Sequence, residues 1–187
     1  MEDIVRAAHD LQKFCDEHRW EFCFIGGIAL QHWGRPRLTR DVDVCLLTGF
    51  GSEDSFVDSL LDEYVARVDH PREFALQNRV LLLKSRDGIG IDISLGGIPF
   101  EAQVVTRSSL VDYASDLRLR ICSCEDFIVL KAFADRVQDW ADVKSVLQTQ
   151  DEVDWPYIDQ QLCPLCEMKD APEIVTKLNE LKDATRS

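Results

Sequence analysis

An alternating run of acidic and apolar residues constrains the fold of this chain more than any other feature. In Arg40-Asp41-Val42-Asp43-Val44 the residues alternate between polar and apolar, which is typical of a half-buried β-strand. Side chains at positions i and i+2 of a strand share one face and lie roughly 6–7 Å apart. Asp41 and Asp43 are therefore expected on one face of a strand over residues 41–47. Two carboxylates so placed repel each other unless a cation lies between them.

A glycine pair precedes this strand by fourteen residues. The largely apolar run over residues 21–25 predicts a buried strand, which Gly26-Gly27 ends. A short helix is predicted directly after the pair, over residues 28–33. Because glycine lacks Cβ, its backbone N–H groups can approach an anion such as phosphate closely. Taken alone, the pair is better explained by a plain strand-to-helix turn, and the two aspartates by an exposed strand face.

A third carboxylate occurs in a second alternating strand. Asp92 stands between Ile91 and Ile93, after a predicted hairpin turn at residues 87–88. If this strand lies beside the 41–47 strand, Asp92 can face the same site as the other two aspartates. Carboxylates, substrate phosphates and waters are the ligands that Mg²⁺ prefers. The pattern predicts a two-ion Mg²⁺ site on Asp41, Asp43 and Asp92, in which Asp92 is a metal ligand or a general base.

The remaining pattern favours an α+β fold, with a short mixed β-sheet flanked by helices and a C-terminal helical segment. We expect a core domain over residues 1–122 and a helical domain over 123–187. Ser52 and Ser123 stand at positions suited to cap the helices that follow them. The other predicted elements are helices over 4–15, 53–64, 124–148 with a break near 137, 156–166 and 172–184, and strands over 80–83, 101–106 and 117–121.

Composition and charge narrow the classes of partner. The chain of 187 residues is 45% hydrophobic, contains no apolar run of membrane-spanning length and lacks the start of a signal peptide. Its seven cysteines are an odd number, which favours reduced thiols and a soluble cytoplasmic protein. The 21 Lys and Arg against 34 Asp and Glu give a net charge of −13, so stable DNA binding is not expected. This charge favours a cationic small molecule, a protein, or a nucleic acid held only near the site.

These motifs resemble the polymerase-β nucleotidyltransferase superfamily. Ile25-Gly26-Gly27-Ile28-Ala29-Leu30, Arg37-x-Thr39-x-Asp41-x-Asp43 and the later Asp92 are most similar to its minimal bacterial branch, the abortive-infection and toxin–antitoxin nucleotidyltransferases. The resemblance covers about residues 20–147. It implies Mg²⁺-dependent transfer of a nucleoside monophosphate from an NTP to an acceptor hydroxyl, with a tRNA end or a protein as the acceptor.

The resemblance also implies roles for individual residues. Lys131 would reach the triphosphate, Asp139 and Asp142 would orient Lys131 or contact the acceptor, and the nucleotide site would include Gly26, Gly27, Arg37, Thr39 and Arg40. On one continuous helix, residues 131, 135, 139 and 142 fall within a roughly 80° arc. The chain departs from the family pattern at Gly27, where many members have serine, and at Gln138, where many have lysine.

Simpler interpretations stay open beside these roles. Lys131 and Asp135 could form an ordinary i, i+4 ion pair, and Asp139 and Asp142 could lie on a solvated helix face. For the whole protein, one alternative is transfer to a cationic small molecule such as an aminoglycoside. Another alternative is a non-catalytic binding module on the same fold.

Overall fold

The computed structural model describes residues 2–114 and 117–186, and the chain divides into two compact units. The first unit comprises residues 1–28 and 38–122, and the second comprises residues 29–37 and 123–187. This division differs from the predicted domains in that residues 29–37 belong to the second unit. In the described ranges, no helix is long and apolar enough to cross a membrane.

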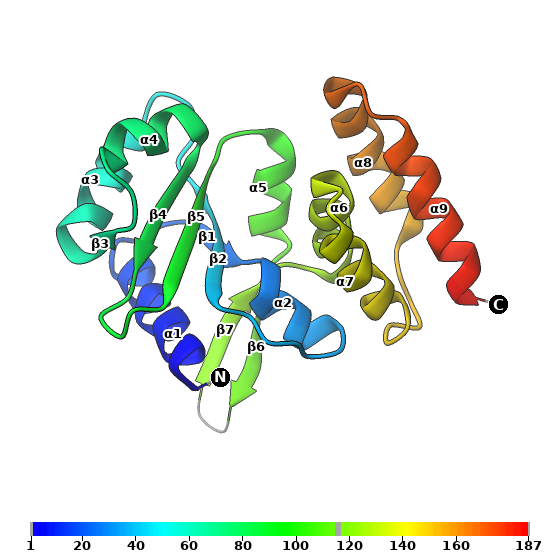
Figure 1. Cartoon of the computed structure of the whole chain (residues 1–187), viewed down its shortest axis with the longest axis horizontal. Helices are drawn as coiled ribbons and strands as arrows, with labels where there is room; N and C mark the ends of the chain where they lie inside the picture. The colour runs from blue at the N-terminus through cyan, green and yellow to red at the C-terminus, as the bar shows by residue number, and fades with distance from the viewer. Residues whose placement is uncertain (1, 115–116, 187) are drawn as a thin grey trace. The chain divides into compact units, whose positions relative to one another are not determined.

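The first unit is built on a mixed sheet whose described strands follow the order β3-β4-β5-β2-β1-β7-β6 (Figure 1). Strand β2 pairs in parallel with β5 and antiparallel with β1, and β1 continues in parallel to β7. The elements of this unit are α1 (Glu2–Glu17), β1 (Phe22–Phe24), β2 (Asp41–Leu47), α3 (Glu53–Glu63), β3 (Val65–Ala66), α4 (Pro71–Asn78), β4 (Val80–Lys84), β5 (Gly90–Gly96), α5 (Pro99–Thr106), β6 (Ser109–Ala114) and β7 (Leu117–Ile121).

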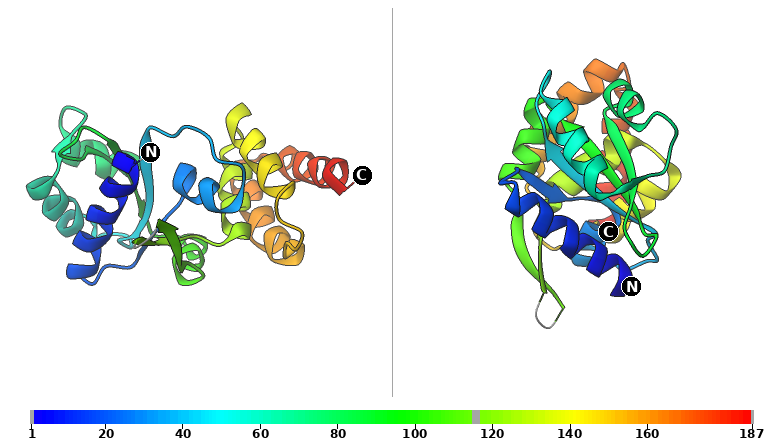
Figure 2. Two further views of the ribbon diagram at one scale, coloured as in Figure 1. Left: turned by 90° about the horizontal axis from the view of Figure 1, so that it is seen from below. Right: turned by 90° about the vertical axis from the view of Figure 1, so that its left-hand side faces the viewer.

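Apolar side chains of the central strands form the core of this unit. The β1 residues are buried, and Val42, Val44 and Leu46 of β2 and Ile91, Ile93 and Leu95 of β5 are at most 1% exposed. Helix α1 packs against β2 and β7, and α5 packs against β1 and β2 (Figures 1 and 2). Burial of these alternating apolar residues stabilises the sheet and fixes which face of β2 carries its aspartates.

Helix α2 (Gly26–Trp33) begins in the first unit, and its residues from Ala29 onward belong to the second. The second unit is otherwise helical, and α6 packs against α7, α8 and α9. Its core includes Phe127, Ile128 and Leu162, none of which is more than 1% exposed. The helices of this unit are α6 (Cys124–Ala134), α7 (Val137–Leu147), α8 (Trp155–Lys169) and α9 (Glu173–Arg186).

The structure confirms the mixed α+β fold and corrects one predicted element. The strand predicted over 101–106 is wrong, because residues 99–106 form helix α5. The β-branched residues near its end favoured a strand, but Pro99 suits the first turn of a helix. Glu101 then accepts hydrogen bonds from the backbone N–H groups of Gly97 and Ile98, at 2.7 and 3.0 Å, and so satisfies donors at the helix start.

The two predicted serine caps differ in outcome. Ser123 accepts a hydrogen bond from the Asp126 N–H at 3.1 Å, so its capping role is confirmed. Ser52 precedes α3 but its side chain makes no capping hydrogen bond, so that prediction is wrong. With φ of −120° and ψ of 3°, the Ser52 backbone lies outside the extended conformation that is typical of a capping residue. The sequence patterns also missed β3, α4 and β6.

Candidate active site

The three predicted aspartates lie on adjacent strands of one sheet. Strands β2 and β5 pair in parallel with Asp43 opposite Asp92 and Asp41 opposite Gly90. Residues directly opposite each other share a face, and Asp41 shares that face with Asp43 because it lies two residues earlier. The valines and isoleucines between the aspartates are buried on the opposite face. The pairing therefore brings three carboxylates onto one face of two neighbouring strands.

The carboxylate face is covered at one end and accessible at the other. Cys45 follows Asp43 on the same face, and its β1 partner Cys23 lies against α5, with Cys23 Sγ 3.7 Å from the Val104 carbonyl oxygen. At the other end of β2 the Asp41 side chain is 44% exposed, and that of Asp92 on β5 is 34% exposed. A solute can therefore reach the aspartates.

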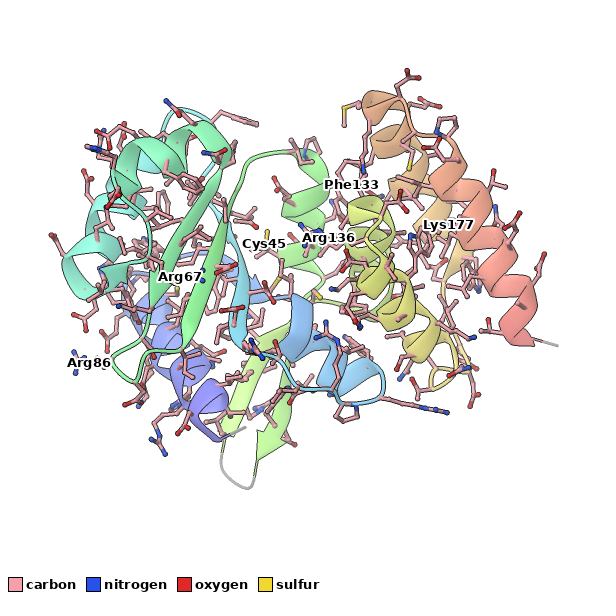
Figure 3. All side chains as sticks on the ribbon, viewed as in Figure 1. Cys45, Arg67, Arg86, Phe133, Arg136 and Lys177 are labelled. Atoms are coloured by element: carbon pink, nitrogen blue, oxygen red, sulfur yellow. The ribbon has the colours of Figure 1, made fainter. Side chains whose placement is uncertain are left out.

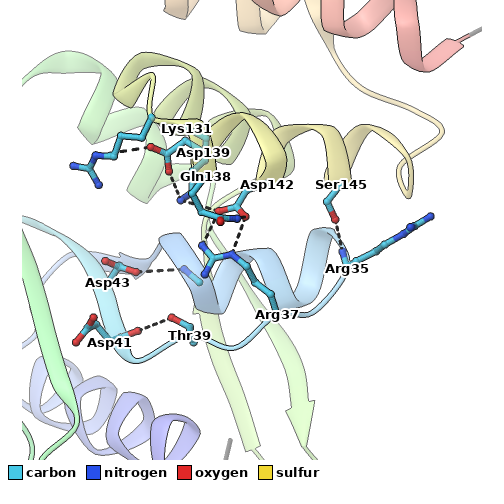
Figure 4. A network of polar contacts seen from close by, with 12 residues as sticks. Arg35, Arg37, Thr39, Asp41, Asp43, Lys131, Gln138, Asp139, Asp142 and Ser145 are labelled. Carbon is cyan, nitrogen blue, oxygen red and sulfur yellow. Dashed lines mark hydrogen bonds and ion pairs between the residues drawn. The ribbon is translucent and has the colours of Figure 1, made fainter.

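The glycine pair packs directly against this face. A Cβ at Gly26 would lie 2.7 Å from Asp43 Cβ, and one at Gly27 would lie 2.6 Å from Thr39 Cβ, so neither position has room for a side chain. Gly26 also has a φ of +56°, which glycine adopts without strain. The Gly27 N–H donates a hydrogen bond to Asp43 Oδ2 at 3.3 Å (Figure 4). The two glycines thus position Asp43 and Thr39, a function that the sequence pattern did not indicate.

Two residues that the sequence analysis missed complete the site. Arg67, directly after β3, forms ion pairs with Asp92 and with Asp41, the latter at 3.7 Å. Gly90 lies below the Asp41 carboxylate, where a Cβ would be 2.9 Å from Asp41 Cγ. Neither residue carries a local signal, because its importance depends on strands that are distant in sequence.

The pKa of Asp92 is subject to opposing effects from the groups around it. Burial raises the pKa of Asp92, the charge of Asp41 raises it further, and Arg67 acts in the opposite direction. In the described ranges, no three acidic, histidine or cysteine side chains converge on one point as a ready metal cage. The guanidinium of Arg67 is nevertheless a cation held between two carboxylates, so the donor atoms suit a divalent ion. The metal roles of Asp41, Asp43 and Asp92 remain predictions.

A second charged cluster lies within the second unit. Lys131 Nζ contacts Asp139 Oδ1 at 2.7 Å and Asp142 Oδ2 at 3.1 Å. Arg37 donates two hydrogen bonds of 2.8 Å to the Asp142 carboxylate, and Gln138 donates one of 3.0 Å (Figure 4). Although burial opposes ionisation, these donors together hold the pKa of Asp142 below its ordinary value.

The contacts of this cluster contradict both simpler interpretations of its charged residues. Asp139 and Asp142 are only 4% and 2% exposed, so the solvated helix face is wrong. Asp135 is directed elsewhere, because its carboxylate contacts Lys177 at 2.9 Å and accepts a hydrogen bond from the Trp140 indole. Lys131 therefore pairs with Asp139 and Asp142 instead of the i+4 residue. A corner between α6 and α7, with Asp135 at a φ of +56°, brings about this arrangement in place of one continuous helix.

The predicted site residues thus form two groups, each within one unit. Arg40 is exposed and Thr39 is buried, with its hydroxyl donating to the Asp41 carbonyl oxygen at 3.2 Å. The first unit holds Gly26, Gly27, Thr39, Arg40, Asp41, Asp43 and Asp92, and the second holds Arg37, Lys131, Asp139 and Asp142.

Two solved structures with a similar fold are described as a nucleotidyltransferase-like protein and an adenylyltransferase. An antigenic nucleotidyltransferase-like protein from Paracoccidioides brasiliensis superposes with a TM-score of 0.62 at 14% identity, over 99% of this chain and 93% of that one. The lincosamide antibiotic adenylyltransferase LnuA, in its lincomycin-bound form, gives a TM-score of 0.51 at 15% identity, over 75% of this chain and 94% of that one. At such identities the likeness establishes the fold alone.

Comparison at the sequence level gives the family. No curated protein matches the chain. The model of the family described as "Nucleotidyl transferase AbiEii toxin, Type IV TA system" matches residues 11–165, which include both groups of predicted site residues. The chain therefore belongs to the AbiEii family of nucleotidyl transferase toxins from type IV toxin–antitoxin systems, and it is a nucleotidyltransferase.

Proposed function

We propose that this nucleotidyltransferase moves a nucleoside monophosphate from an NTP to an acceptor hydroxyl, releases pyrophosphate and requires Mg²⁺. The observation that supports it most directly is the pairing of Asp43 with Asp92 on adjacent parallel strands, with Asp41 on the same face. Three carboxylates on one face of two strands repel one another and offer the oxygen ligands that Mg²⁺ prefers, and Mg²⁺ is the cation that accompanies nucleotide phosphates.

The residues of the first unit have distinct roles in this proposal. Asp41 and Asp43 would hold the metal, and Asp92 would either complete the ligand set or accept the proton of the acceptor hydroxyl. A bound divalent ion would neutralise phosphate charge and lower the pKa of that hydroxyl. Gly26 and Gly27 leave room for the side chains of Asp43 and Thr39 and so position them beside the nucleotide site. Catalysis then depends mainly on positioning and charge neutralisation.

The phosphate roles of Arg37, Arg40 and Lys131 belong to the same proposal. Arg37 and Lys131 are held by Asp142 and Asp139 in the second unit, so these carboxylates orient the N–H donors that each residue would offer to a phosphate. Arg40 is exposed and can meet a phosphate directly.

Two classes of acceptor are compatible with the proposed reaction. Membership of a toxin family supports a cellular macromolecule, such as a tRNA end or a protein, as the acceptor. The net charge of −13 supports a cationic small molecule instead, because an acidic surface attracts cations and repels nucleic acid. LnuA, which shares the fold, is an adenylyltransferase named for lincosamide antibiotics.

The test incubates the full chain with Mg²⁺, each α-labelled NTP, and tRNA, protein or an aminoglycoside as acceptor. We expect pyrophosphate release and transfer of the label, reduced at least about 100-fold in Asp43→Asn. Asp62→Asn, an exposed aspartate of α3, is the matched control and should retain wild-type activity. The acceptor that takes the label decides between the candidates, and binding to RNA should weaken steeply with salt. The absence of turnover with every NTP, together with no metal-dependent NTP binding, would contradict the proposal.

A further inference from the structure

Arg67 occupies the position between two of the predicted metal ligands. Its guanidinium contacts Asp92 on β5 and lies 3.7 Å from Asp41 on β2, while its side chain is 30% exposed (Figure 3). An arginine in a protein cannot lose its proton. A divalent ion that needs the same carboxylate oxygens must therefore displace the guanidinium physically.

The backbone of Arg67 is fixed, whereas its side chain has room to move. The Arg67 N–H donates to the Leu82 carbonyl oxygen at 2.9 Å, which continues the pairing of β3 with β4. Leu82 is the β4 partner of Asp92, so this bond fixes Arg67 at the level of the carboxylates. The long flexible side chain reaches the aspartates from this anchor and can leave them without disturbing the sheet.

Gly90 provides the space in which the guanidinium and the Asp41 carboxylate meet. A Cβ at this position would lie 2.9 Å from Asp41 Cγ and 3.2 Å from Arg67 Nη1. Glycine therefore allows both groups to lie over the start of β5. The cation position is formed by residues of three strand segments and does not result from a chance surface contact.

We propose that Arg67 is an internal cation that holds Asp41 and Asp92 in the metal-free protein and is exchanged for the divalent ion when the ion binds. The exchange keeps the like-charged carboxylates neutralised in both states and weakens metal binding by the cost of displacing the guanidinium. Arg67 is thus a positioning residue that sets the metal concentration the enzyme requires. The inference rests on the proposed metal-dependent function.

The test measures Mn²⁺ binding to the full chain by the loss of the electron paramagnetic resonance signal of free Mn²⁺. Removing the competitor in Arg67→Gln should lower the Kd for Mn²⁺ about three- to tenfold, given the modest strength of partly exposed ion pairs. Arg67→Lys keeps the charge but loses the planar fork that bridges two carboxylates, so its Kd should lie between the two. Circular dichroism checks that the variants are folded.

A matched control separates competition from a change in net charge. Arg86→Gln removes one positive charge from an 87% exposed side chain that pairs with Glu63, so its Kd should stay at the wild-type value. In the wild-type protein, Mg²⁺ should also move the Arg67 guanidinium ¹H–¹⁵N resonance to that of a solvated arginine.

The outcomes separate this inference from the proposed function. An unchanged or higher Kd in Arg67→Gln would overturn the exchange while leaving metal binding intact. An equal decrease in Arg86→Gln would reduce the effect to net charge and also overturn it. If neither wild type nor variant binds Mn²⁺, with or without NTP, the metal-dependent function itself fails, and this inference fails with it.

Discussion

At the scale of single residues, the site depends on glycines that make room for carboxylates. Gly26, Gly27 and Gly90 each lie where a Cβ would overlap a side chain of the aspartate-bearing segment. A glycine pair before a helix is recognisable in a sequence as a turn. The space that a side chain would take at these glycines is filled by Asp43, Thr39 and Asp41. Only the paired strands of the folded protein show this.

Gly90→Ala should disable the site more than the fold. Gly90 does not have a positive φ, so alanine fits its backbone, but the added methyl group must push the Asp41 carboxylate away. We expect kcat/KM for pyrophosphate release to fall about tenfold or more, with a loss of unfolding free energy of about 1–3 kcal/mol. Ser94→Ala on the same face of β5 is the control. Full activity in Gly90→Ala would show that the position of Asp41 is not critical.

The buried charge of Asp142 should give a pH-dependent stability. Asp142→Asn removes the anion of the Arg37 ion pair and one of the two carboxylates that contact Lys131, and we expect a loss of about 2–4 kcal/mol at pH 7, measured by urea unfolding. The pKa of Asp142 is lowered by folding, so its contribution is present above the unfolded value of about 3.9 and is lost as pH falls through the folded value. The difference between wild type and variant should therefore shrink below about pH 4. A difference that is constant with pH would contradict the ionic origin.

At the scale of elements, the corner within the predicted 124–148 helix decides which charged side chains meet. The pattern over 124–148 indicated one helix with a break near 137, and the structure has α6 and α7 separated by Asp135 and Arg136. The corner matters because it turns Asp135 toward Lys177 and leaves Lys131 to Asp139 and Asp142. A helical-wheel argument on a continuous helix placed Asp135 with the others, and the corner removes it.

The two serines at helix starts offer a matched comparison of capping. Ser123→Ala removes the cap hydrogen bond and the bond that the hydroxyl donates to the buried Asp126 carboxylate, and should destabilise the protein by about 1–3 kcal/mol. Ser52→Ala removes no cap bond and should change the unfolding free energy by less than about 0.5 kcal/mol. Urea unfolding followed by circular dichroism measures both. Equal effects of the two substitutions would show that the Ser123 bond does not stabilise α6.

At the scale of the whole molecule, the excess of acidic residues acts against folding. With 34 Asp and Glu against 21 Lys and Arg, the folded chain concentrates a net charge of −13. Self-repulsion of this kind destabilises the compact state and is screened by salt.

Raising NaCl from 10 to 200 mM at pH 7 should therefore increase the Tm by a few degrees, measured by scanning calorimetry. At pH 5, nearer the sequence pI of about 4.6, the same change should raise the Tm less. A fall of Tm with salt at pH 7 would show that attractive ion pairs outweigh the net repulsion.

The sequence by itself determined the two acidic strands, the glycine pair and the family, because strand alternation and the lack of a Cβ at glycine act within a few residues. Only the tertiary structure decided that Asp92 lies opposite Asp43, that Arg67 lies between Asp92 and Asp41, and that Gly90 makes room for both. Those relations join strand segments about 25 to 50 residues apart in sequence, and the register between them is set by burial of apolar faces over the whole sheet. A local sequence pattern does not show which distant residues meet. The sequence therefore predicted the carboxylates of the site but not Arg67, their counter-ion.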